Sequence, residues 1–285
     1  MGDTAEAIPE GRKERLVANT DGVTVLITGA TDGLGRALAG RAHGEGWDVL
    51  AHGRSEDKLA ALAAELPGVR TFRADLASLT EVAALADEVR AATDRLHVLV
   101  SNAGIGFTEP GGGERLESAD GHELRFAVNY LAGYSLTRRL LPLLRGSAPA
   151  RIVQIASAGQ HPIDFGDVML ERGYDGVRAY RQSKLAQVMF TFDLAAELDG
   201  SGVTATTLHP GTYMPTKMVT AEGISPLTPL DHGVEATWRL IADPALDGVS
   251  GVYFNGTSEA RPEGQALDQD ARRALRELSE RLTGW

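Results

Sequence analysis

Residues 23–36, which read VTVLITGATDGLGR, determine the fold class of this chain. An apolar run typical of a buried strand comes first, a helical pattern follows, and Gly29, Gly33 and Gly35 lie between them. Glycines at such a junction let backbone N–H groups and the amino end of the helix approach a pyrophosphate, because no Cβ obstructs it. A tight turn would explain a lone glycine-rich stretch equally well. The position of these glycines between the first strand and the first helix favours a nucleotide site.

The rest of the chain alternates short apolar runs with longer segments in which apolar residues recur every three or four positions. We predict strands at 23–27, 47–50, 69–72, 98–100, 151–155, 203–208 and 251–254. We predict helices at 34–46, 55–66, 79–92, 120–144, 178–199 and 265–282. This alternation predicts a single α/β domain, a Rossmann-type doubly wound parallel sheet of about seven strands with helices on both faces.

The composition is that of a globular protein with a formal net charge of −11 over 285 residues. The negative charge argues against binding to nucleic acid or to an anionic membrane surface. The sequence has no cysteine, which excludes disulfides and thiolate ligands, and its histidines lack ligand-like spacing, so we expect no metal. The start lacks the apolar core of a signal peptide, and no apolar run approaches the ~20 residues that span a bilayer. We therefore predict a cytoplasmic protein with no membrane partner.

Further motifs follow the glycine-rich turn in order. The turn has the spacing T-G-x-x-x-G-x-G, Asn102-Ala103-Gly104 follows the fourth predicted strand, Tyr180 and Lys184 form a Tyr-x-x-x-Lys pair, and His209-Pro210-Gly211 follows the sixth strand. Together these motifs resemble the short-chain dehydrogenase/reductase family, and the resemblance extends from about Val23 to the C-terminus. A Tyr-x-x-x-Lys pair alone would be chance or a core tyrosine in most proteins. Its place among the other motifs gives it weight.

Tyr180 and Lys184 are the candidate acid–base pair, because residues four apart on a helix share one face. A phenol has an ordinary pKa of about 10, and a neighbouring ammonium lowers that pKa toward the range useful for acid–base catalysis. The resemblance implies that Tyr180 is the catalytic acid/base, and that Lys184 both tunes it and binds the nicotinamide ribose. It implies catalytic roles also for Ser157, which would hydrogen-bond the substrate oxygen, and for Asn129, which would hold a water for proton relay.

The resemblance implies a nicotinamide dinucleotide, and the end of the second strand indicates which one. A carboxylate there would select NAD(H), and none is present in Ala51-His52-Gly53-Arg54-Ser55. The guanidinium groups of Arg54 and Arg36 suit a 2′-phosphate, so we predict NADP(H), although Arg36 could also be a solvated helix residue. The residues that we assign to the cofactor are Gly29, Thr31, Asp32, Gly33, Leu34, Gly35, Arg36, Arg54, Asp75, Leu76, Asn102, Ala103, Gly104, Tyr180, Lys184, Pro210, Gly211 and Thr212.

One departure from the family pattern concerns the motif P-G-x-x-x-T. Proline stands at position 215 where threonine is expected, so either Thr212 or Thr216 takes its place. We expect a polar N-terminal extension at 1–20 and one NADP-binding reductase domain at 21–285, in which a loop at about 212–231 forms a flap over the substrate. The candidate pocket walls are His161, Phe165, Met169, Tyr213, Met214 and Met218.

A second departure concerns the spacing between Ser157 and Tyr180, which stand 23 positions apart. The segment at 159–176 and the C-terminal segment at 271–285 resemble the retinol-dehydrogenase-like branch of the family. This branch implies a bulky apolar carbonyl or alcohol, but a likeness to a branch does not fix a substrate.

The sequence therefore predicts an NADP(H)-dependent oxidoreductase, a ketoreductase or alcohol dehydrogenase, that interconverts a carbonyl and a hydroxyl on a fairly bulky apolar small molecule, as in secondary metabolism. One alternative is a non-catalytic NADP-binding regulatory protein, which would not need Ser157, Tyr180 and Lys184 together. Another is an epimerase or dehydratase, which the glycine spacing disfavours. We also expect a homodimer that pairs through the helices at 120–144 and 178–199.

Overall fold

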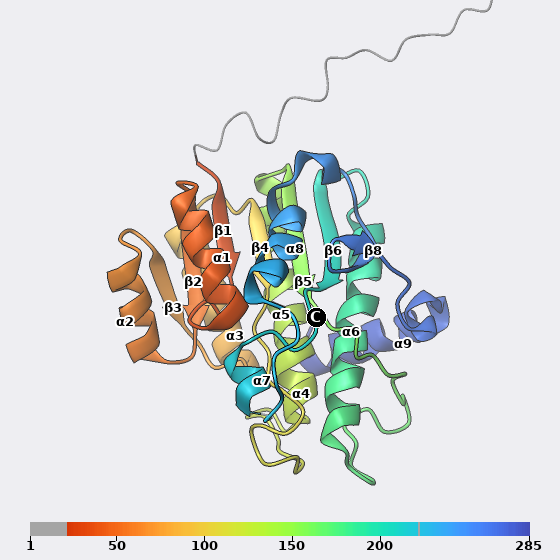
Figure 1. Ribbon diagram of the computed structural model, residues 1–285. Helices are drawn as coiled ribbons and strands as arrows, with labels where there is room; N and C mark the ends of the chain where they lie inside the picture. The colour runs from red at the N-terminus through yellow and green to blue at the C-terminus, as the bar shows by residue number, and fades with distance from the viewer. Residues whose placement is uncertain (1–21, 222) are drawn as a thin grey trace, which may run out of the picture.

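An eight-stranded sheet lies at the centre of the computed structural model, which describes residues 22–221 and 223–285 (Figure 1). The strand order is β3-β2-β1-β4-β5-β6-β7-β8, in which β1 to β7 run parallel and β8 pairs antiparallel with β7. The strands are β1 (Thr24–Ile27), β2 (Asp48–Gly53), β3 (Arg70–Arg73), β4 (Val98–Ser101), β5 (Ala150–Ile155), β6 (Val203–His209), β7 (Val252–Asn255) and β8 (Ser258–Glu259). All seven predicted strands are confirmed, whereas β8 is an addition. The predicted extension at 1–20 lies outside the described residues.

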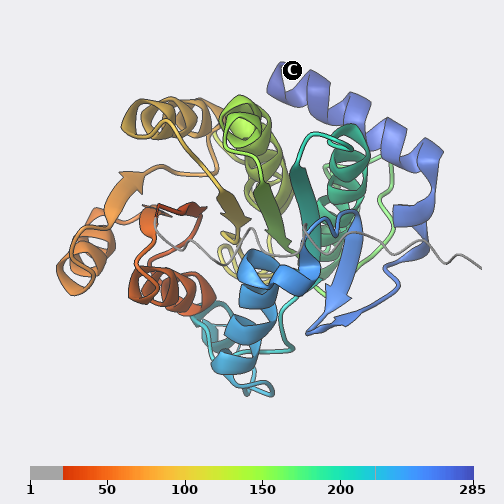
Figure 2. The same ribbon diagram turned by 90° about the horizontal axis from the view of Figure 1, so that it is seen from above.

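Helices cover both faces of the sheet (Figure 2). One face carries α1 (Gly33–Gly44), α2 (Glu56–Glu65) and α8 (Leu230–Ala242), and the other carries α3 (Leu79–Ala92), α5 (Ala132–Gly146) and α6 (Gly176–Glu197). Every residue of β1, β4 and β5 is buried, because strands covered on both faces have no solvent side. The side chains of Asp32, Ser55 and Ser78 cap the first three helices by accepting hydrogen bonds from backbone N–H groups of the first turn.

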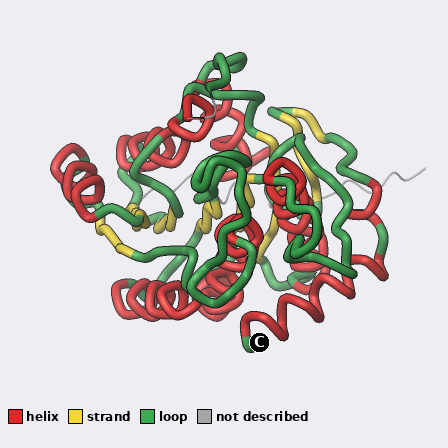
Figure 3. The backbone as a smooth tube through the Cα atoms, turned by 90° about the horizontal axis from the view of Figure 1, so that it is seen from below, coloured by secondary structure: helices red, strands yellow, loops and turns green. Residues whose placement is uncertain are grey.

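The carboxyl ends of the parallel strands lie along one edge of the sheet. The strand order reverses there between β1 and β4, which is where open α/β sheets bind their ligands. Figure 3 looks at this edge and shows the loops that gather over it. The predicted site residues come from the segments that follow β1 to β6, from the π-helical turn that carries Asn129, and from α6.

The predicted helix at 120–144 begins later and is interrupted. Residues 117–123 form a turn closed by a bridge between Glu117 and Glu123, and α4 (Leu124–Phe126) follows it. A π-helical turn, η2 (Ala127–Leu131), then leads into α5. Such turns within helices often occur at functional sites, and this one carries Asn129.

The predicted flap at 212–231 is only partly a loop. It contains a short helix, α7 (Lys217–Ala221), and α8 begins within it at Leu230. Neither helix is among those predicted. A 3-10 turn, η3 (Pro244–Leu246), follows α8, and a second, η4 (Gly264–Leu267), precedes the last helix.

The last helix, α9 (Gln269–Thr283), packs against α6. Asp193 of α6 pairs with Arg272 at 3.0 Å and with Arg276 at 2.9 Å. The hydroxyl of Ser279 in α9 lies 2.6 Å from that of Tyr130 in η2. Figure 2 shows α9 lying outside α5 and α6. The helix thus covers part of the surface through which the predicted homodimer would form, and that homodimer stays a prediction.

Candidate active site

The candidate acid–base pair lies on α6, whose amino end is fixed by Asp175. The Asp175 carboxylate accepts hydrogen bonds from the backbone N–H groups of Val177 and Arg178. The Lys184 Nζ atom lies 5.7 Å from the centre of the Tyr180 ring. Lys184 is buried, whereas Tyr180 is partly exposed. The four-residue spacing therefore brings the phenol and the amine together at the carboxyl edge of the sheet.

The surroundings of Lys184 are polar but uncharged. Its amine donates hydrogen bonds to the carbonyl oxygen of Ile155 at 3.0 Å and to Oε1 of Gln187 at 2.9 Å. Burial lowers the pKa of Lys184 to about 7, because the ammonium loses its hydration. The charge that would favour a phenolate at Tyr180 therefore depends on pH near neutrality. Gln187 is not among the predicted site residues, since a glutamine on a helix carries no distinguishing signal.

Asn129 connects the loop after β4 to α6. Its Oδ1 atom accepts a hydrogen bond from the N–H of Ile105 at 2.8 Å, and its Nδ2 atom donates to the Ile105 carbonyl at 3.2 Å and to Oγ of Ser183 at 3.0 Å. The Ser183 hydroxyl in turn donates to the carbonyl of Tyr180 at 2.7 Å. A Cβ on Gly104 would lie 3.1 Å from Asn129 Oδ1 and 3.6 Å from Lys184 Nζ. Asn129, Gly104 and Lys184 thus lie side by side.

Ser157 follows β5, and its backbone is held in place. The Ser157 carbonyl accepts hydrogen bonds from Nε2 of Gln160 at 2.9 Å and from the hydroxyl of Tyr253 at 3.2 Å. Its Oγ atom accepts from the N–H of Gly159 at 3.0 Å. A Cβ on Gly159 would lie 3.5 Å from Ser157 Oγ and 3.7 Å from Arg181, the residue after Tyr180. The Ser157 loop is therefore packed against the part of α6 that carries the tyrosine.

The glycine-rich turn has the backbone that a dinucleotide cradle requires. Gly29 and Gly33 adopt φ values of +66° and +50°, which side-chain-bearing residues rarely adopt. A Cβ on Gly35 would lie 2.3 Å from the carbonyl oxygen of Gly29, so only glycine lets α1 approach β1 this closely. Leu34, between Gly33 and Gly35, is buried in the apolar core. These features fit a pyrophosphate at the amino end of α1, so the residues present fit the dinucleotide that the sequence implies.

The N-A-G segment is joined directly to this turn. Asn102 donates from Nδ2 to the carbonyl of Thr28 at 2.8 Å, and the backbone N–H groups of Asn102 and Ala103 donate to Oγ1 of Thr28 at 2.9 and 3.1 Å. A Cβ on Gly29 would lie 3.0 Å from the Cα of Ala103. The side chain of Asn102 therefore fixes the shape of the turn.

Charged side chains lie near the end of β2, beside the glycine-rich turn. Arg54 is exposed and makes no hydrogen bond or ion pair within the described ranges, whereas the guanidinium of Arg36 pairs with Glu65. Asp32 pairs with Lys58 at 2.7 Å, and this cation holds the pKa of Asp32 below its ordinary value. Arg54 is thus better placed than Arg36 to take up a phosphate, and Lys58, which is not among the predicted residues, adds a second cation nearby.

A buried histidine that the sequence analysis did not single out supports the turn from below. Nδ1 of His52 accepts a hydrogen bond from the N–H of Gly29 at 3.3 Å, and Nε2 lies 3.1 Å from the carbonyl of Ala74. Burial lowers the pKa of His52, which keeps the ring neutral and able to accept this bond. Thr31 lies across the turn, where a Cβ on Gly53 would come within 2.6 Å of it.

The remaining predicted cofactor residues follow β3 and β6. Asp75 accepts a hydrogen bond from the N–H of Ala77 at 3.0 Å, and Leu76 is buried. After β6, Pro210 and Gly211 lead to Thr212, whose hydroxyl lies 3.0 Å from Nε2 of His209.

Thr212 and Thr216 lie in different surroundings. The methyl group of Thr216 would be 3.0 Å from a Cβ on Gly33, which places Thr216 over the glycine-rich turn. The hydroxyl of Thr212 is engaged by His209. Of the two threonines, Thr216 is the one that lies against the turn.

The predicted pocket walls separate into two groups. Met214 and Met169 pack into or against the two cores: Met214 lies against Gly233 of α8, and the sulfur of Met169 accepts a hydrogen bond from the N–H of Glu123 at 3.4 Å. They are therefore poor candidates for substrate contacts. Phe165 and Tyr213 expose 37% and 40% of their surface, and Tyr213 has a φ of +47°, an uncommon backbone conformation. His161 and Met218 are half-buried.

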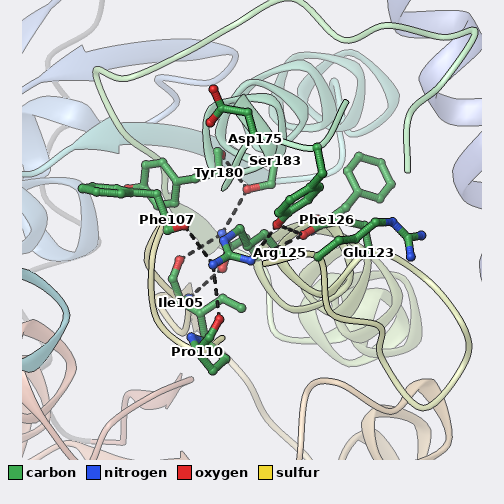
Figure 4. A network of polar contacts seen from close by, with 12 residues as sticks. Ile105, Phe107, Pro110, Glu123, Arg125, Phe126, Asp175, Tyr180 and Ser183 are labelled. Carbon is green, nitrogen blue, oxygen red and sulfur yellow. Dashed lines mark hydrogen bonds and ion pairs between the residues drawn. The ribbon is translucent and has the colours of Figure 1, made fainter. Parts of the chain in front are cut away.

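A further polar network near the site is centred on residues that the sequence does not predict. It is centred on Arg125 of α4 and includes Glu123 and Tyr174 (Figure 4). Arg125 lies in an ordinary helical pattern of the sequence. Most of the partners of Arg125 are backbone carbonyls, which every residue has, so the sequence gives no signal for them.

With this geometry in place, the chain belongs to the short-chain dehydrogenase/reductase family: residues 23–224 match the family described as short chain dehydrogenase. Proteins of this family are oxidoreductases that use a nicotinamide cofactor. Among curated proteins, the chain is 36% identical to retinol dehydrogenase 14 from Homo sapiens, over 92% of this chain and 87% of that protein. It is 34% identical to polyprenol dehydrogenase from Mus musculus, over 92% of this chain and 84% of that protein. The predicted retinol-dehydrogenase-like branch is confirmed.

Solved structures show the same fold. An uncharacterised protein from Mycobacterium paratuberculosis superposes with a TM-score of 0.77 at 29% identity, covering 92% of this chain and 93% of that one. The RhlG/NADP active-site complex from Pseudomonas aeruginosa gives a TM-score of 0.65 at 25% identity, covering 82% and 94%. None of the helices within residues 22–221 and 223–285 combines the length and the apolar character that a membrane span requires.

Proposed function

We propose that this protein is an NADP(H)-dependent reductase that interconverts a carbonyl and a hydroxyl on a bulky apolar small molecule. The observation that carries this proposal is the placement of Tyr180 beside the buried amine of Lys184, at the edge of the sheet where the glycine-rich turn lies. A regulatory protein that only bound the dinucleotide would have no use for this pair. The non-catalytic alternative is therefore the weaker one.

Tyr180 is the proposed proton donor in the reducing direction. Its phenol gives a proton to the substrate oxygen, and Ser157 donates a hydrogen bond to the same oxygen, which stabilises the negative charge that develops there. Lys184, when charged, favours the phenolate that remains. Asn129 Oδ1 has a second lone pair beside Lys184, and we assign to it the water that returns the proton. The nicotinamide, when bound, supplies or accepts the hydride.

The preference for NADP(H) rests on charge at the end of β2. Arg54 follows this strand, is exposed and has no ion-pair partner among the described residues, so its guanidinium can bind a 2′-phosphate in a bidentate manner. No carboxylate in 51–55 would repel that phosphate. The structural relative from Pseudomonas aeruginosa was solved with NADP, which supports the same choice.

The substrate class rests on apolar side chains and on the relatives. Phe165 and Tyr213 are exposed large apolar side chains in segments at the carboxyl edge of the sheet. The relatives are named for retinol and polyprenol, both long apolar alcohols. We therefore propose an aldehyde, ketone or alcohol attached to a large hydrocarbon framework, handled in the cytoplasm.

The test is oxidation of NADPH by the purified chain against retinoid-like aldehydes, steroid ketones and aromatic polyketide ketones, with small ketones for comparison. We expect turnover of at least one bulky class and about tenfold lower kcat/KM for small ketones, since buried apolar contacts improve transition-state binding. Tight NADPH binding with no turnover in any class would favour the regulatory alternative.

A further inference from the structure

Arg125 is completely buried, and each of its three guanidinium nitrogens has a polar partner (Figure 4). Its five hydrogen bonds go to the carbonyls of Gly106 at 2.9 Å, Phe107 at 2.9 Å, Thr108 at 3.1 Å and Pro110 at 3.3 Å, and to the phenol oxygen of Tyr174 at 2.7 Å. Four of these acceptors belong to one short loop, 106–110, which follows β4. A single side chain therefore fixes the backbone of this loop.

The countercharge of Arg125 is buried with it. Glu123 lies 3.7 Å away, is 1% exposed, accepts a hydrogen bond from the Tyr174 hydroxyl at 2.9 Å and caps the N–H of Phe126 at 2.7 Å. Removing one member of a buried pair leaves the other charge unpaired, so such a network holds one arrangement strongly. Tyr174 joins it from the segment that leads into α6.

The loop that Arg125 fixes carries an aromatic side chain against the proposed catalytic tyrosine. The rings of Phe107 and Tyr180 meet edge to face, with centroids 6.2 Å apart and an angle of 74°. The carbonyl of Phe107 presses on the start of α6, where a Cβ on Gly176 would come within 2.2 Å of it. Asn129 binds the backbone N–H and carbonyl of Ile105, the residue just before the loop 106–110.

Phe107 is thus anchored by its backbone on both sides while its ring remains half-buried outside the two apolar cores. Figure 4 shows the Phe107 and Tyr180 rings together at one side of the network. A half-buried ring beside a proton donor is positioned to contact whatever molecule receives the proton.

We propose that Phe107 is a wall of the substrate site, and that Arg125 is a positioning residue that sets specificity by holding this wall against Tyr180. The inference rests on the proposed function, because it assigns the wall to the same reaction. A fixed aromatic ring favours substrates with a flat, conjugated apolar group next to the reacting carbon, because aromatic rings interact more favourably with planar π-systems. Flexible aliphatic carbonyls gain less from it.

The test compares Arg125→Lys, Phe107→Ala and the double variant, each purified as the full chain. Binding of a conjugated ketone and of a saturated ketone of similar size to the NADP-loaded chain is measured by calorimetry, together with kcat and KM. We expect each single variant to weaken the conjugated ligand about tenfold and the saturated one less than about threefold, with NADPH affinity unchanged.

The double variant is the decisive measurement. If Arg125 acts through Phe107, the double variant loses no more affinity for the conjugated ketone than Phe107→Ala alone. Additive losses, or equal losses for the two ketones, would overturn the inference. Should Arg125→Lys fail to fold, Tyr174→Phe removes one guanidinium partner while keeping the ring, and we expect a smaller loss with the same selectivity and the same non-additivity.

Arg115→Lys is the matched control. Arg115 donates to the carbonyl of Met169 at 3.0 Å and pairs with Glu117, outside the Arg125 network, so its replacement should leave both affinities unchanged. The outcome also separates the two proposals. Selective binding without turnover would contradict the proposed function alone, whereas turnover without this selectivity would contradict the inference alone.

Discussion

The amine of Lys184 lies 5.7 Å from the centre of the Tyr180 ring, and Lys184 is only 3% exposed. The pair therefore combines helical spacing with close approach of the two side chains and burial of the amine. Burial makes the lysine cation costly, and the same burial makes any charge that it carries act strongly on the phenol.

The free energy of unfolding of the cofactor-free protein should depend on pH because of this buried amine. Lys184 has a pKa of about 7 when folded and an ordinary pKa of about 10.4 when unfolded, so between these values the unfolded chain binds a proton that the folded chain does not. Below pH 7 the folded protein bears the whole cost of the buried ammonium. This cost falls as pH rises, because Lys184 loses its proton in the folded state first. Relative to Lys184→Met, the wild-type free energy of unfolding should rise by about 3 kcal/mol between about pH 7 and 9.5.

Urea denaturation at a series of pH values measures this difference. Lys58→Met, which removes a partly exposed lysine that pairs with Asp32, serves as the control and should show no comparable rise. Parallel curves for wild type and Lys184→Met would mean that the amine is hydrated.

The two arginines should contribute unequally to cofactor choice. Arg54→Ala should weaken NADPH binding about tenfold or more and NADH binding less than about threefold, because only NADPH has the phosphate that a guanidinium binds. Arg36→Ala should have a smaller effect, since Arg36 is paired with Glu65. Fluorescence titrations of both nucleotides measure these affinities, and similar losses of NADPH and NADH in Arg54→Ala would refute the assignment.

Two glycines on α1 provide a matched pair for testing the cradle. A Cβ on Gly35 would lie 2.3 Å from the carbonyl of Gly29, whereas a Cβ on Gly40 meets nothing within 4 Å. Gly35→Ala should destabilise the fold by about 1–3 kcal/mol and abolish dinucleotide binding, while Gly40→Ala should stabilise it by about 0.5–1 kcal/mol. Denaturation and NADPH titration of the two variants check this. Normal NADPH binding by Gly35→Ala would show that α1 need not approach β1 so closely.

The C-terminal helix should govern assembly. Because α9 packs against α6 through the pairs of Asp193 with Arg272 and Arg276, it occupies surface that the predicted homodimer would use. We therefore expect single chains of 30.2 kDa in light scattering, and self-association of a chain that ends before Asp268. A stable dimer of the full chain would confirm the homodimer predicted from the sequence and would contradict this role of α9.

The sequence predicts those features that arise from periodic apolar residues and from motifs with a fixed spacing. All seven strands of the parallel sheet were accessible in this way, as was the family. The strand β8 (Ser258–Glu259) is two polar residues long and has no such pattern. The π-turn at Asn129 and the delayed start of α4 were hidden, because local hydrogen bonds decide them while the apolar periodicity continues.

The supporting residues of the site are harder to predict for a physical reason. Arg125 binds four loop carbonyls, His52 binds one N–H and lies against one carbonyl, and Gln187 binds the amine of Lys184. Most of these partners are backbone groups, which are the same in every residue, so no sequence motif marks them. Such side chains become visible only when the fold brings distant segments together.

Turnover by Tyr180→Phe tests the central claim most directly, because the variant removes one oxygen and keeps the ring that packs against Phe107. With NADPH and the best carbonyl substrate, we expect kcat to fall about 100-fold or more while the dissociation constant for NADPH stays within about threefold, as for the loss of a general acid. Tyr134→Phe, in the core, should keep both values. Wild-type turnover by Tyr180→Phe would contradict the account.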